Sequence, residues 1–431
     1  MKSARNIYRE EVDFTALALQ SPDFAKYVRQ NGQLDFSNPS AVRQLTISLL
    51  QRDFGLKVDL PEDRLCPPVP NRLNYILWLQ DLIDTTGTKY SDQYDPGREV
   101  VGLDIGTGCC SIYPLLGCAS QPRWKFVATD IDDKNIQFAQ NNVLKNGLES
   151  RIRVIKTEPS DPLIPLDTKI SLERLDFTMC NPPFYESQDE MVASAEAKAR
   201  PPFSACTGAE VEMVTPGGEI AFVSRMIEES LQLQTRVQWF TTMLGKLSSV
   251  SVIVEKLIER KNNNYAVTEF VQGTKTRRWA VAWSWGDLRP TTDVARGISG
   301  FPKHLLPFPS EVSFHISNAS IDAIGHKIDA ELHSLPIKWV WHHAMATGVG
   351  FAMENVWSRQ ARRKRQQQQK GNTDAEKEKI SEDSAALGFK IQLKQKAVEK
   401  DVEVLIRWLK GTDSVLFESF CGMLKRKVEE R

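Results

Sequence analysis

Residues 99–117 read EVVGLDIGTGCCSIYPLLG, an apolar run that ends in a glycine-rich turn and continues into a second apolar segment. The run is typical of a buried strand, and Gly106 and Gly108 allow a tight turn that brings the backbone close to a ligand. No Gly-Lys-Ser/Thr follows, and the third glycine of the dinucleotide fingerprint is missing, so neither phosphate-binding motif is present. Alone, the turn could be purely structural. It predicts a strand followed by a helix.

Short apolar runs separated by amphipathic segments follow this unit and predict a mostly parallel sheet. The predicted strands are 99–106, 124–131, 151–156, 174–181, 217–226, 249–256, 268–273 and 277–285. Helices are predicted at 133–146 and 224–244, and the last two runs predict an antiparallel hairpin. The pattern therefore indicates an α/β fold built from βαβ units.

Three further regions surround this core. Residues 1–98 alternate helical periodicity with turn signals, which predicts a helical capping extension; the core spans 99–288 and a linker 289–309. Residues 310–431 predict a smaller α+β domain interrupted by a polar insert at about 359–385. Its predicted strands are 311–317, 336–343, 389–396 and 403–411, and its predicted helix, 414–428, places Leu416, Phe420, Met423 and Leu424 on one face.

The composition of the chain limits the kinds of partner and active site that it can have. Lys plus Arg and Asp plus Glu both number 55, so the net charge neither predicts nor excludes a nucleic-acid partner. No long apolar span or secretory leader is visible, and the seven cysteines form no CxxC pair, so we expect a soluble intracellular protein with reduced thiols. All six histidines lie beyond residue 300. The first two-thirds of the chain therefore cannot build a histidine-dependent triad or metal site.

Polar residues end two further predicted strands. Asp130 ends WKFVATD, about 20 residues after the glycine turn, where a carboxylate can accept both hydroxyls of a ribose. Asn181 begins NPPF after the fourth run, and Pro182 and Pro183 stop the strand because they cannot donate to its ladder. The Asn181 oxygen and a neighbouring carbonyl could both accept from one amino group, and Phe184 offers a face for a planar target. The structural alternatives are a helix-capping aspartate and an ordinary Asx-Pro turn.

DIGTG, the acidic strand end and NPPF, in that order, resemble class I methyltransferases, which use S-adenosyl-L-methionine to methylate an exocyclic amine. Stretches such as ARNIYREEVDF, PPVPNRLNYILWLQDL and TEFVQGTKTRRWAVAWSW resemble the methyltransferase-like protein 16 family of RNA adenine-N6 methyltransferases, over about residues 3–285. The resemblance implies a Rossmann-like, seven-stranded sheet and S-adenosyl-L-methionine as cofactor. It also implies U6 small nuclear RNA as substrate, at an adenosine of an ACAGA-type sequence in a structured RNA; other structured RNAs stay open.

The resemblance also implies roles for individual residues. The implied catalytic set is Asn181, Pro182, Pro183 and Phe184, and the cofactor set is Arg72, Asp104, Gly106, Gly108, Asp130, Asp161 and Asn181. Arg72 would pair with the cofactor's carboxylate. Where relatives carry a lysine, the loop KTEPSDPL (156–163) has Glu158 and Asp161, so lysine-mediated gating is in doubt and Asp161 is expected at the adenine.

Basic residues near aromatic ones predict where RNA would bind. They are Arg5, Lys198, Arg200, Lys246, Lys275, Arg277 and Arg278. Each alone could belong to a solvated face, but all follow regions that contact RNA in the resembled family. The target base would be flipped from its stack to reach Phe184.

The C-terminal region resembles that family's second RNA-binding region, a kinase-associated-1-like module. Its basic run consists of Arg362, Arg363, Lys364 and Arg365. These residues are expected to contact RNA phosphates, with a nuclear-import signal or a solvated helix end as alternatives. We expect a nuclear protein, leave the cytoplasm open, and expect catalysis by a single copy without metal or membrane.

Three other functions stay open from sequence. NPPF also suits guanine N2 in RNA and the amide of a protein glutamine. Glutamine methylation would favour an acidic or apolar groove, whereas arginine and lysine flank this motif. The third alternative is an RNA-binding protein with little catalysis.

Overall fold

The computed structural model describes residues 5–196, 208–272, 276–361, 363, 381–395 and 401–430. The chain forms two compact units. The N-terminal unit comprises Met1–Asp84, Gln93–Gly286 and Gly297–Leu306. The C-terminal unit comprises Thr85–Asp92, Asp287–Arg296 and Pro307–Arg431. The six described cysteines form no disulfide.

An eight-stranded sheet with the order β3-β2-β1-β4-β5-β7-β6-β8 forms the centre of the N-terminal unit. Its strands are β1 (Val100–Ile105), β2 (Trp124–Asp130), β3 (Ile152–Lys156), β4 (Leu175–Cys180), β5 (Val237–Leu244), β6 (Tyr265–Gln272), β7 (Thr276–Trp283) and the two-residue β8 (Arg296–Gly297). Strands β1 to β5 run parallel to one another. Strands β6 and β7 form an antiparallel hairpin, and β7 pairs antiparallel with β5. The seven long strands confirm the expected Rossmann-like sheet.

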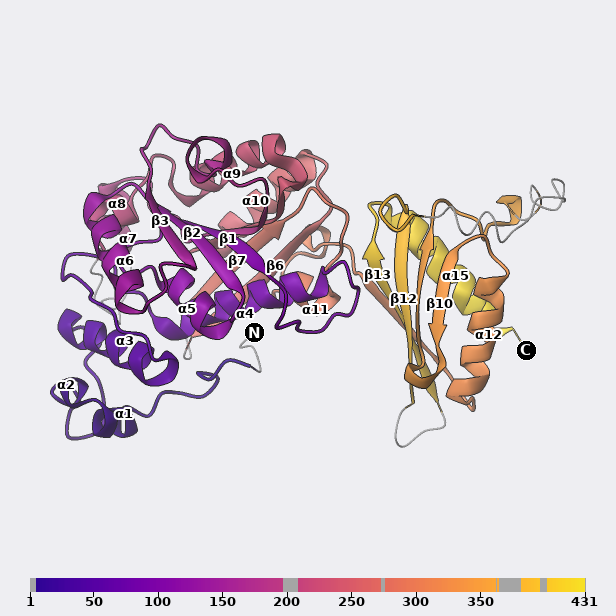
Figure 1. Cartoon of the computed structure of the whole chain (residues 1–431), viewed down its shortest axis with the longest axis horizontal. Coiled ribbons are helices and arrows are strands. Elements are labelled where there is room, and N and C mark those ends of the chain that lie inside the picture. The colour runs from indigo at the N-terminus through magenta and orange to yellow at the C-terminus, as the bar shows by residue number, and fades with distance from the viewer. Residues whose placement is uncertain are drawn as a thin grey trace. The chain divides into compact units, whose positions relative to one another are not determined.

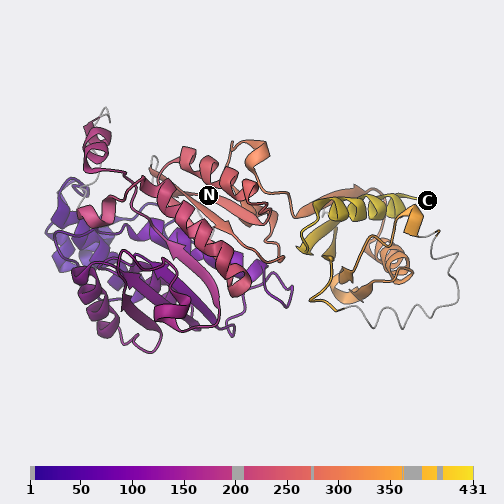
Figure 2. The same cartoon turned by 90° about the horizontal axis from the view of Figure 1, so that it is seen from above.

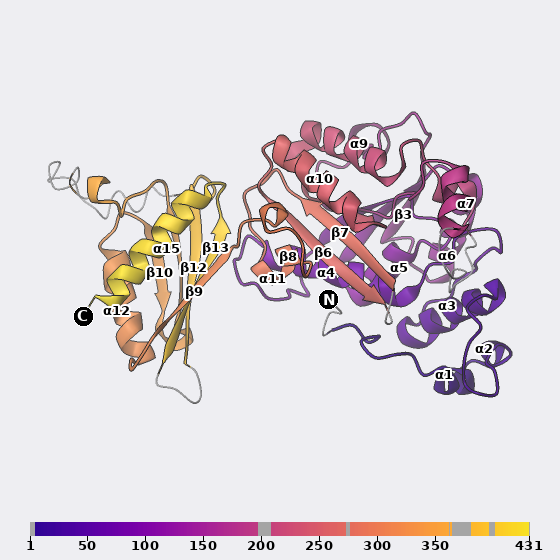
Figure 3. The same cartoon turned by 180° about the vertical axis from the view of Figure 1, so that it is seen from behind.

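Helices cover both faces of this sheet. Figure 1 shows α4 (Val69–Thr85), α5 (Ile112–Ser120) and α6 (Asp133–Lys145) on one side. Figure 3, from behind, shows α9 (Gly218–Leu233) and α10 (Leu247–Glu259) on the other. There they share an apolar core with the strands and with the π-helical turn η1 (Leu166–Ile170). The sheet is thus buried on both faces, as parallel sheets require.

Two predicted strands and part of a predicted helix were wrong. Residues 217–226 and 249–256 lie in α9 and α10, whereas the predicted helix 224–244 ends at Leu233 and its second half forms β5. In α10, Val250, Ile253, Val254 and Leu257 are all buried and recur at helical spacing, so one face packs on the sheet although β-branched residues favour strands. Strand β5 is buried along almost its whole length.

The N-terminal extension is helical, as predicted. It contains α1 (Phe14–Gln20), α2 (Pro22–Ala25), α3 (Pro39–Phe54) and α4. Asn38 caps α3 by accepting from the amides of Ser40 and Ala41, and Gly55 ends it in a left-handed conformation. The remaining short elements of the unit are α7 (Gln188–Glu196), α8 (Glu210–Met213), η2 (Gln234–Arg236) and η3 (Lys303–Leu305).

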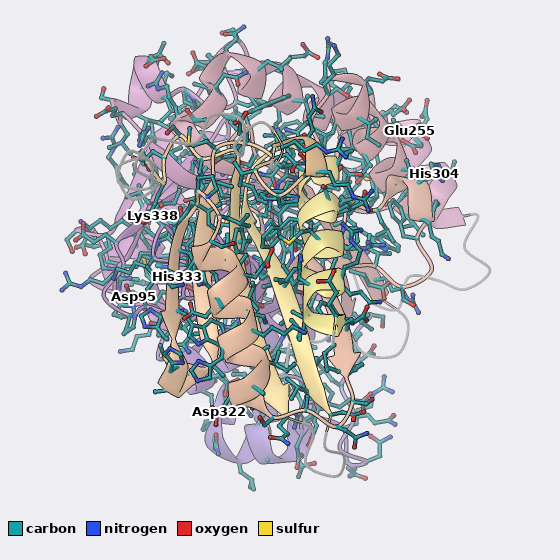
Figure 4. The ribbon with its side chains drawn as sticks, turned by 90° about the vertical axis from the view of Figure 1, so that its right-hand side faces the viewer. Asp95, Glu255, His304, Asp322, His333 and Lys338 are labelled. Carbon is teal, nitrogen blue, oxygen red and sulfur yellow. The ribbon has the colours of Figure 1, made fainter. Side chains whose placement is uncertain are left out.

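A five-stranded antiparallel sheet with the order β10-β11-β12-β13-β9 forms the C-terminal unit. Its strands are β9 (Glu311–Ile316), β10 (Lys338–His342), β11 (Thr347–Ala352), β12 (Leu387–Gln395) and β13 (Val402–Lys410), with α11 (Thr292–Ala295) and η4 (His343–Met345) as short helices. Two helices, α12 (Ile321–His333) and α15 (Ser414–Glu429), pack together over the sheet (Figures 2 and 4). Figure 4 labels Asp322 and His333 of α12. Helix α12 and strand β11 had no sequence prediction. Phe420, Met423 and Leu424 of α15 are buried, and Leu416 packs partly buried against the same core.

Two segments from outside residues 310–431 complete the C-terminal unit. Residues 85–92 were expected in the N-terminal extension and 289–309 in a linker, but 85–92 and 287–296 pack in the C-terminal unit. The Nζ of Lys390 binds the carbonyls of Tyr90 and Ser91 at 3.2 and 3.3 Å and the Asp92 carboxylate at 3.1 Å. Buried Arg407 donates to the carbonyl of Arg289 at 2.6 Å. The unit is therefore discontinuous in sequence.

Candidate active site

The strand register brings three predicted site residues to one edge of the sheet. Ile105 of β1 lies opposite both Thr129 of β2 and Cys180 of β4. The next residue along each strand is Gly106, Asp130 or Asn181. Because ligands bind at the carboxyl ends of parallel strands, this edge is the natural position for a site.

The glycine turn follows β1 in the conformation that its sequence requires. Gly106 and Gly108 have φ of 73° and 64°, which side chains disfavour. The amides of Gly106 and Thr107 both donate to the Thr129 carbonyl, at 2.9 and 2.8 Å. A Cβ at Gly106 would meet no atom within 4 Å, so the turn leaves space next to its backbone.

Asp130 holds this turn through its carboxylate. One oxygen accepts from the Gly108 amide at 2.9 Å, and the other accepts from the Asp132 amide at 3.0 Å. Burial raises the pKa of Asp130, although these hydrogen bonds oppose the shift. The carboxylate is therefore fixed in direction beside the turn, which suits the ribose contact predicted for it.

Arg72, Asp104 and Tyr113 form a buried polar group beside the same edge. Both carboxylate oxygens of Asp104, and the Tyr113 hydroxyl, have no hydrogen-bond partner among the described residues. Burial raises the pKa of Asp104 to about 7; the nearby Thr107 hydroxyl and Arg72 oppose the shift, and the charge of Asp130 adds to it. Arg72, 6% exposed, lies over the Tyr113 ring at 5.5 Å and donates to the Met243 sulfur at 3.2 Å.

These buried groups fit S-adenosyl-L-methionine. A buried charge without a hydrogen-bond partner is costly, so the buried Arg72 guanidinium and the unpartnered Asp104 carboxylate favour a ligand that carries both a carboxylate and an ammonium group. The amino-acid end of the cofactor carries these two groups. Arg72 would then hold its carboxylate and Asp104 its ammonium, while the Gly106–Gly108 turn and Asp130 would hold the nucleoside.

Asn181 presents an acceptor at the same edge. Its side-chain oxygen is buried and has no hydrogen-bond partner in the described part of the chain. The backbone behind it is fixed, because the Tyr185 amide donates to the Met213 carbonyl at 3.1 Å and the Tyr185 carbonyl accepts from Thr215 at 2.9 Å. The NPPF segment is therefore anchored with one acceptor left for a ligand.

Gly245 makes room for the Phe184 ring. A Cβ at Gly245 would lie 3.1 Å from the Cδ1 atom of Phe184. The Gly245 amide donates to the buried Glu219 carboxylate at 2.6 Å, which fixes this turn. The Arg278 guanidinium lies 5.3 Å from the Phe184 ring centre.

Glu212 is a site residue that sequence reasoning missed. One oxygen of its carboxylate accepts from the amides of Leu65 and Ala209 at 2.8 and 2.9 Å, and the other accepts from the Asn135 side chain at 3.4 Å. The same Asn135 amide donates to Asp130, also at 3.4 Å. Burial raises the pKa of Glu212. Its only sequence signal is a glutamate three residues after Ala209, the spacing of a capping box.

Asp161 lies in the predicted loop after β3, but its carboxylate is engaged by a residue of η1 and by an amide of the loop. It pairs with Lys169 at 2.6 Å and accepts from the Glu158 amide at 2.7 Å, and the ion pair lowers its pKa. Its contact with the cofactor's adenine stays a prediction.

The predicted RNA-binding residues fall into two groups. Among the described ones, Arg5 pairs with Asp81, Lys246 with Glu190 at 3.0 Å and Arg277 with Glu269 at 3.0 Å; Arg278 lies over the Phe184 ring and Arg363 is exposed. Lys198, Arg200, Lys275, Arg362, Lys364 and Arg365 lie outside the described residues. RNA binding by all of these residues stays a prediction.

The described ranges contain neither a metal-binding cluster nor a membrane-spanning helix. No group of three histidine, cysteine or acidic residues there could hold a metal ion. No described helix is long and apolar enough to cross a membrane.

Comparison with known proteins identifies the relatives. A family model described as RNA methyltransferase matches residues 2–287. The U6 small nuclear RNA (adenine-(43)-N(6))-methyltransferase of Schizosaccharomyces pombe is 35% identical over 403 residues, which cover 93% of this chain and 96% of that protein. The human RNA N(6)-adenosine-methyltransferase METTL16 is 44% identical over 291 residues, 66% of this chain and 50% of that protein. The chain thus matches almost all of the first relative and half of the second.

Solved structures agree with these relatives. The catalytic domain of human METTL16 in complex with the MAT2A 3′UTR hairpin 1 matches with a TM-score of 0.58 and 41% identity, covering 65% of this chain and 94% of that one. The N-terminal domain of human METTL16 in complex with SAH matches with a TM-score of 0.55 and 40% identity, covering 66% of this chain and 98% of that one.

Proposed function

Because the chain belongs to the methyltransferase-like protein 16 family of RNA methyltransferases, we propose that it methylates N6 of an adenosine in U6 small nuclear RNA. The observation that carries the proposal is the buried, unpartnered Asn181 oxygen on the anchored NPPF segment, at the same sheet edge as the glycine turn and Asp130. The relatives named for U6 RNA support this substrate, and an ACAGA-type sequence in a structured RNA is the expected context.

The site supports direct transfer of a methyl group. S-adenosyl-L-methionine supplies an electrophilic methyl group when bound. The target adenine would stack on Phe184 and donate an N6 hydrogen to the Asn181 oxygen, which favours the tetrahedral nitrogen of the transition state. The N6–CH3 bond would form as the S–CH3 bond breaks, S-adenosylhomocysteine would leave, and the surplus N6 proton would pass to water. No histidine lies among residues 1–303, so this scheme needs no histidine base.

The test is methyl transfer from labelled S-adenosyl-L-methionine to U6 RNA, followed by analysis of the nucleosides. We expect N6-methyladenosine from the wild type, and a loss of at least about 100-fold in kcat for Asn181→Ala, a scale typical of removing one electrostatic donor or acceptor. Gln140→Ala removes an exposed amide on α6 and serves as the control. Label on N2-methylguanine or on protein glutamine would refute the proposal, as would equal transfer by wild type and Asn181→Ala.

We also propose that one copy of the chain suffices for catalysis and that the C-terminal unit adds RNA affinity in the nucleus. Specific activity should then be independent of enzyme concentration. Deleting residues 310–431 should weaken RNA binding more than cofactor binding. Equal RNA affinity with and without these residues would refute the role of the C-terminal unit.

A further inference from the structure

Arg278, near the start of β7, holds its guanidinium over the ring that the target base needs. The guanidinium carbon lies 5.3 Å from the centre of the Phe184 ring. Its guanidinium donates a hydrogen bond to the neighbouring Arg277 carbonyl, at 2.9 Å. Within the described part of the chain, no carboxylate forms an ion pair with it. Arg278 is thus a largely covered cation whose main contact is an aromatic ring.

The surroundings of Arg278 include residues of the cofactor site. Its pKa is lowered by burial and then by the positive charge of Arg72, so the two guanidinium groups are close enough to repel each other. Tyr113, whose ring lies under Arg72, also interacts electrostatically with Arg278 and raises its pKa. Arg278 therefore contacts Phe184 and lies near the residues that would hold the cofactor, where the N6 atom of a target adenine must be placed.

A guanidinium and an adenine cannot occupy the same face of one ring. Cation–ring contacts are weak and are easily exchanged for a stronger partner. A phosphodiester is such a partner, because a planar guanidinium binds two of its oxygens at once. A target nucleotide brings an adenine and a phosphate to the site together.

We propose that Arg278 is a gate on Phe184, an inference that rests on the proposed function. Without RNA its guanidinium covers the ring and excludes other planar groups. A phosphate next to the target nucleotide draws the guanidinium away, and the adenine takes its place. A base thus gains the ring only when it arrives on a nucleic-acid backbone. Arg278 acts through Phe184 and is a positioning residue.

A ligand without phosphate tests the gate separately from methyl transfer. Adenosine is titrated by NMR into the wild type and into Arg278→Ala, both saturated with S-adenosylhomocysteine so that the cofactor site is filled. Removing the competing cation should strengthen adenosine binding by about two- to fivefold. Arg260→Ala, which removes an exposed arginine paired with Glu228, should leave adenosine binding unchanged. Weaker binding by Arg278→Ala would mean that Arg278 sandwiches the base, and equal binding would mean that it does not cover the ring; either result overturns the proposal.

A second measurement tests the role of the phosphate. U6 RNA with one uncharged methylphosphonate, 5′ or 3′ of the target adenosine, is compared with unmodified RNA. On unmodified RNA, Arg278→Ala should transfer the methyl group more slowly than the wild type. On one of the two neutral RNAs it should transfer the methyl group faster than the wild type, because no charged phosphate is there to open the wild-type gate. Slower transfer by the variant on all three RNAs would refute the gate. If the wild type methylates none of them, the proposed function fails, while the adenosine titration still decides the gate.

Discussion

At the scale of single residues, the site depends on buried polar groups that have no hydrogen-bond partner within the described structure. Asp104 is the clearest case, because neither of its oxygens has a partner in the described structure and burial raises its pKa to about 7. Such a group opposes folding once it is ionised, and a cationic ligand beside it relieves that cost. This is a reason to expect the cofactor to stabilise the protein.

Asp104 should make stability depend on pH. Its pKa is raised from 3.8 to about 7 on folding, so its cost is absent at low pH, grows as pH rises through this window and is complete above it. Asp104→Asn should therefore be more stable than the cofactor-free wild type, by more at pH 8 than at pH 5. The gain in the free energy of unfolding is at most about 1.4 kcal/mol for each unit by which folding raises the pKa. Urea unfolding at both values, with exposed Asp189→Asn as control, measures this; a pH-independent difference would contradict it.

Glu212 should influence cofactor binding although sequence reasoning did not find it. In Glu212→Gln, the oxygen that accepts a hydrogen bond from the Asn135 side chain is replaced by an N–H group. The Asn135 side chain must then either lose this hydrogen bond or flip, which points its oxygen at the Asp130 carboxylate and repels it. We expect a several-fold higher KM for S-adenosyl-L-methionine with a smaller change in kcat. Steady-state kinetics of this variant and of exposed Glu210→Gln check the prediction. A change in kcat alone would show that Glu212 does not position the cofactor.

At the scale of elements, the central strands are packed so closely that β1 tolerates no side chain at Gly102. A Cβ there would lie 2.3 Å from Cζ of Phe177 on the neighbouring strand β4. Gly102→Ala should therefore destabilise the N-terminal unit by about 1–3 kcal/mol through overpacking. In Gly422→Ala on α15 the new methyl group has its nearest neighbour at 3.9 Å, and helix propensity should add about 0.5–1 kcal/mol to stability. Thermal unfolding of both variants checks this contrast; equal effects would refute it.

At the scale of the whole molecule, the C-terminal unit needs residues that precede the first strand of the other unit in sequence. Asp92→Ala removes a partner of Lys390 and should destabilise the C-terminal unit by about 1–3 kcal/mol. Calorimetry should show the loss in the unfolding of this unit, and exposed Glu99→Ala should not reproduce it. Were the loss to fall only on the N-terminal unit, residues 85–92 would not belong to the C-terminal one.

Local sequence patterns specify the parts of the protein whose structure depends on residues close together in the chain. The glycine turn, Asp130 and NPPF each follow an apolar run directly, and parallel strands bring such ends to one edge whatever lies between them. The same local reasoning failed for α9, β5 and α10, because their type depends on which face is buried.

Contacts between residues far apart in the chain arise from the tertiary fold alone. Glu212 reaches Asn135 and Leu65, Arg278 covers Phe184, and residues 85–92 pack beside Lys390. Each contact joins segments far apart in the chain, and burial against the folded core places them together. No local pattern encodes such a pairing, because neither partner needs the other to form its own strand, turn or helix.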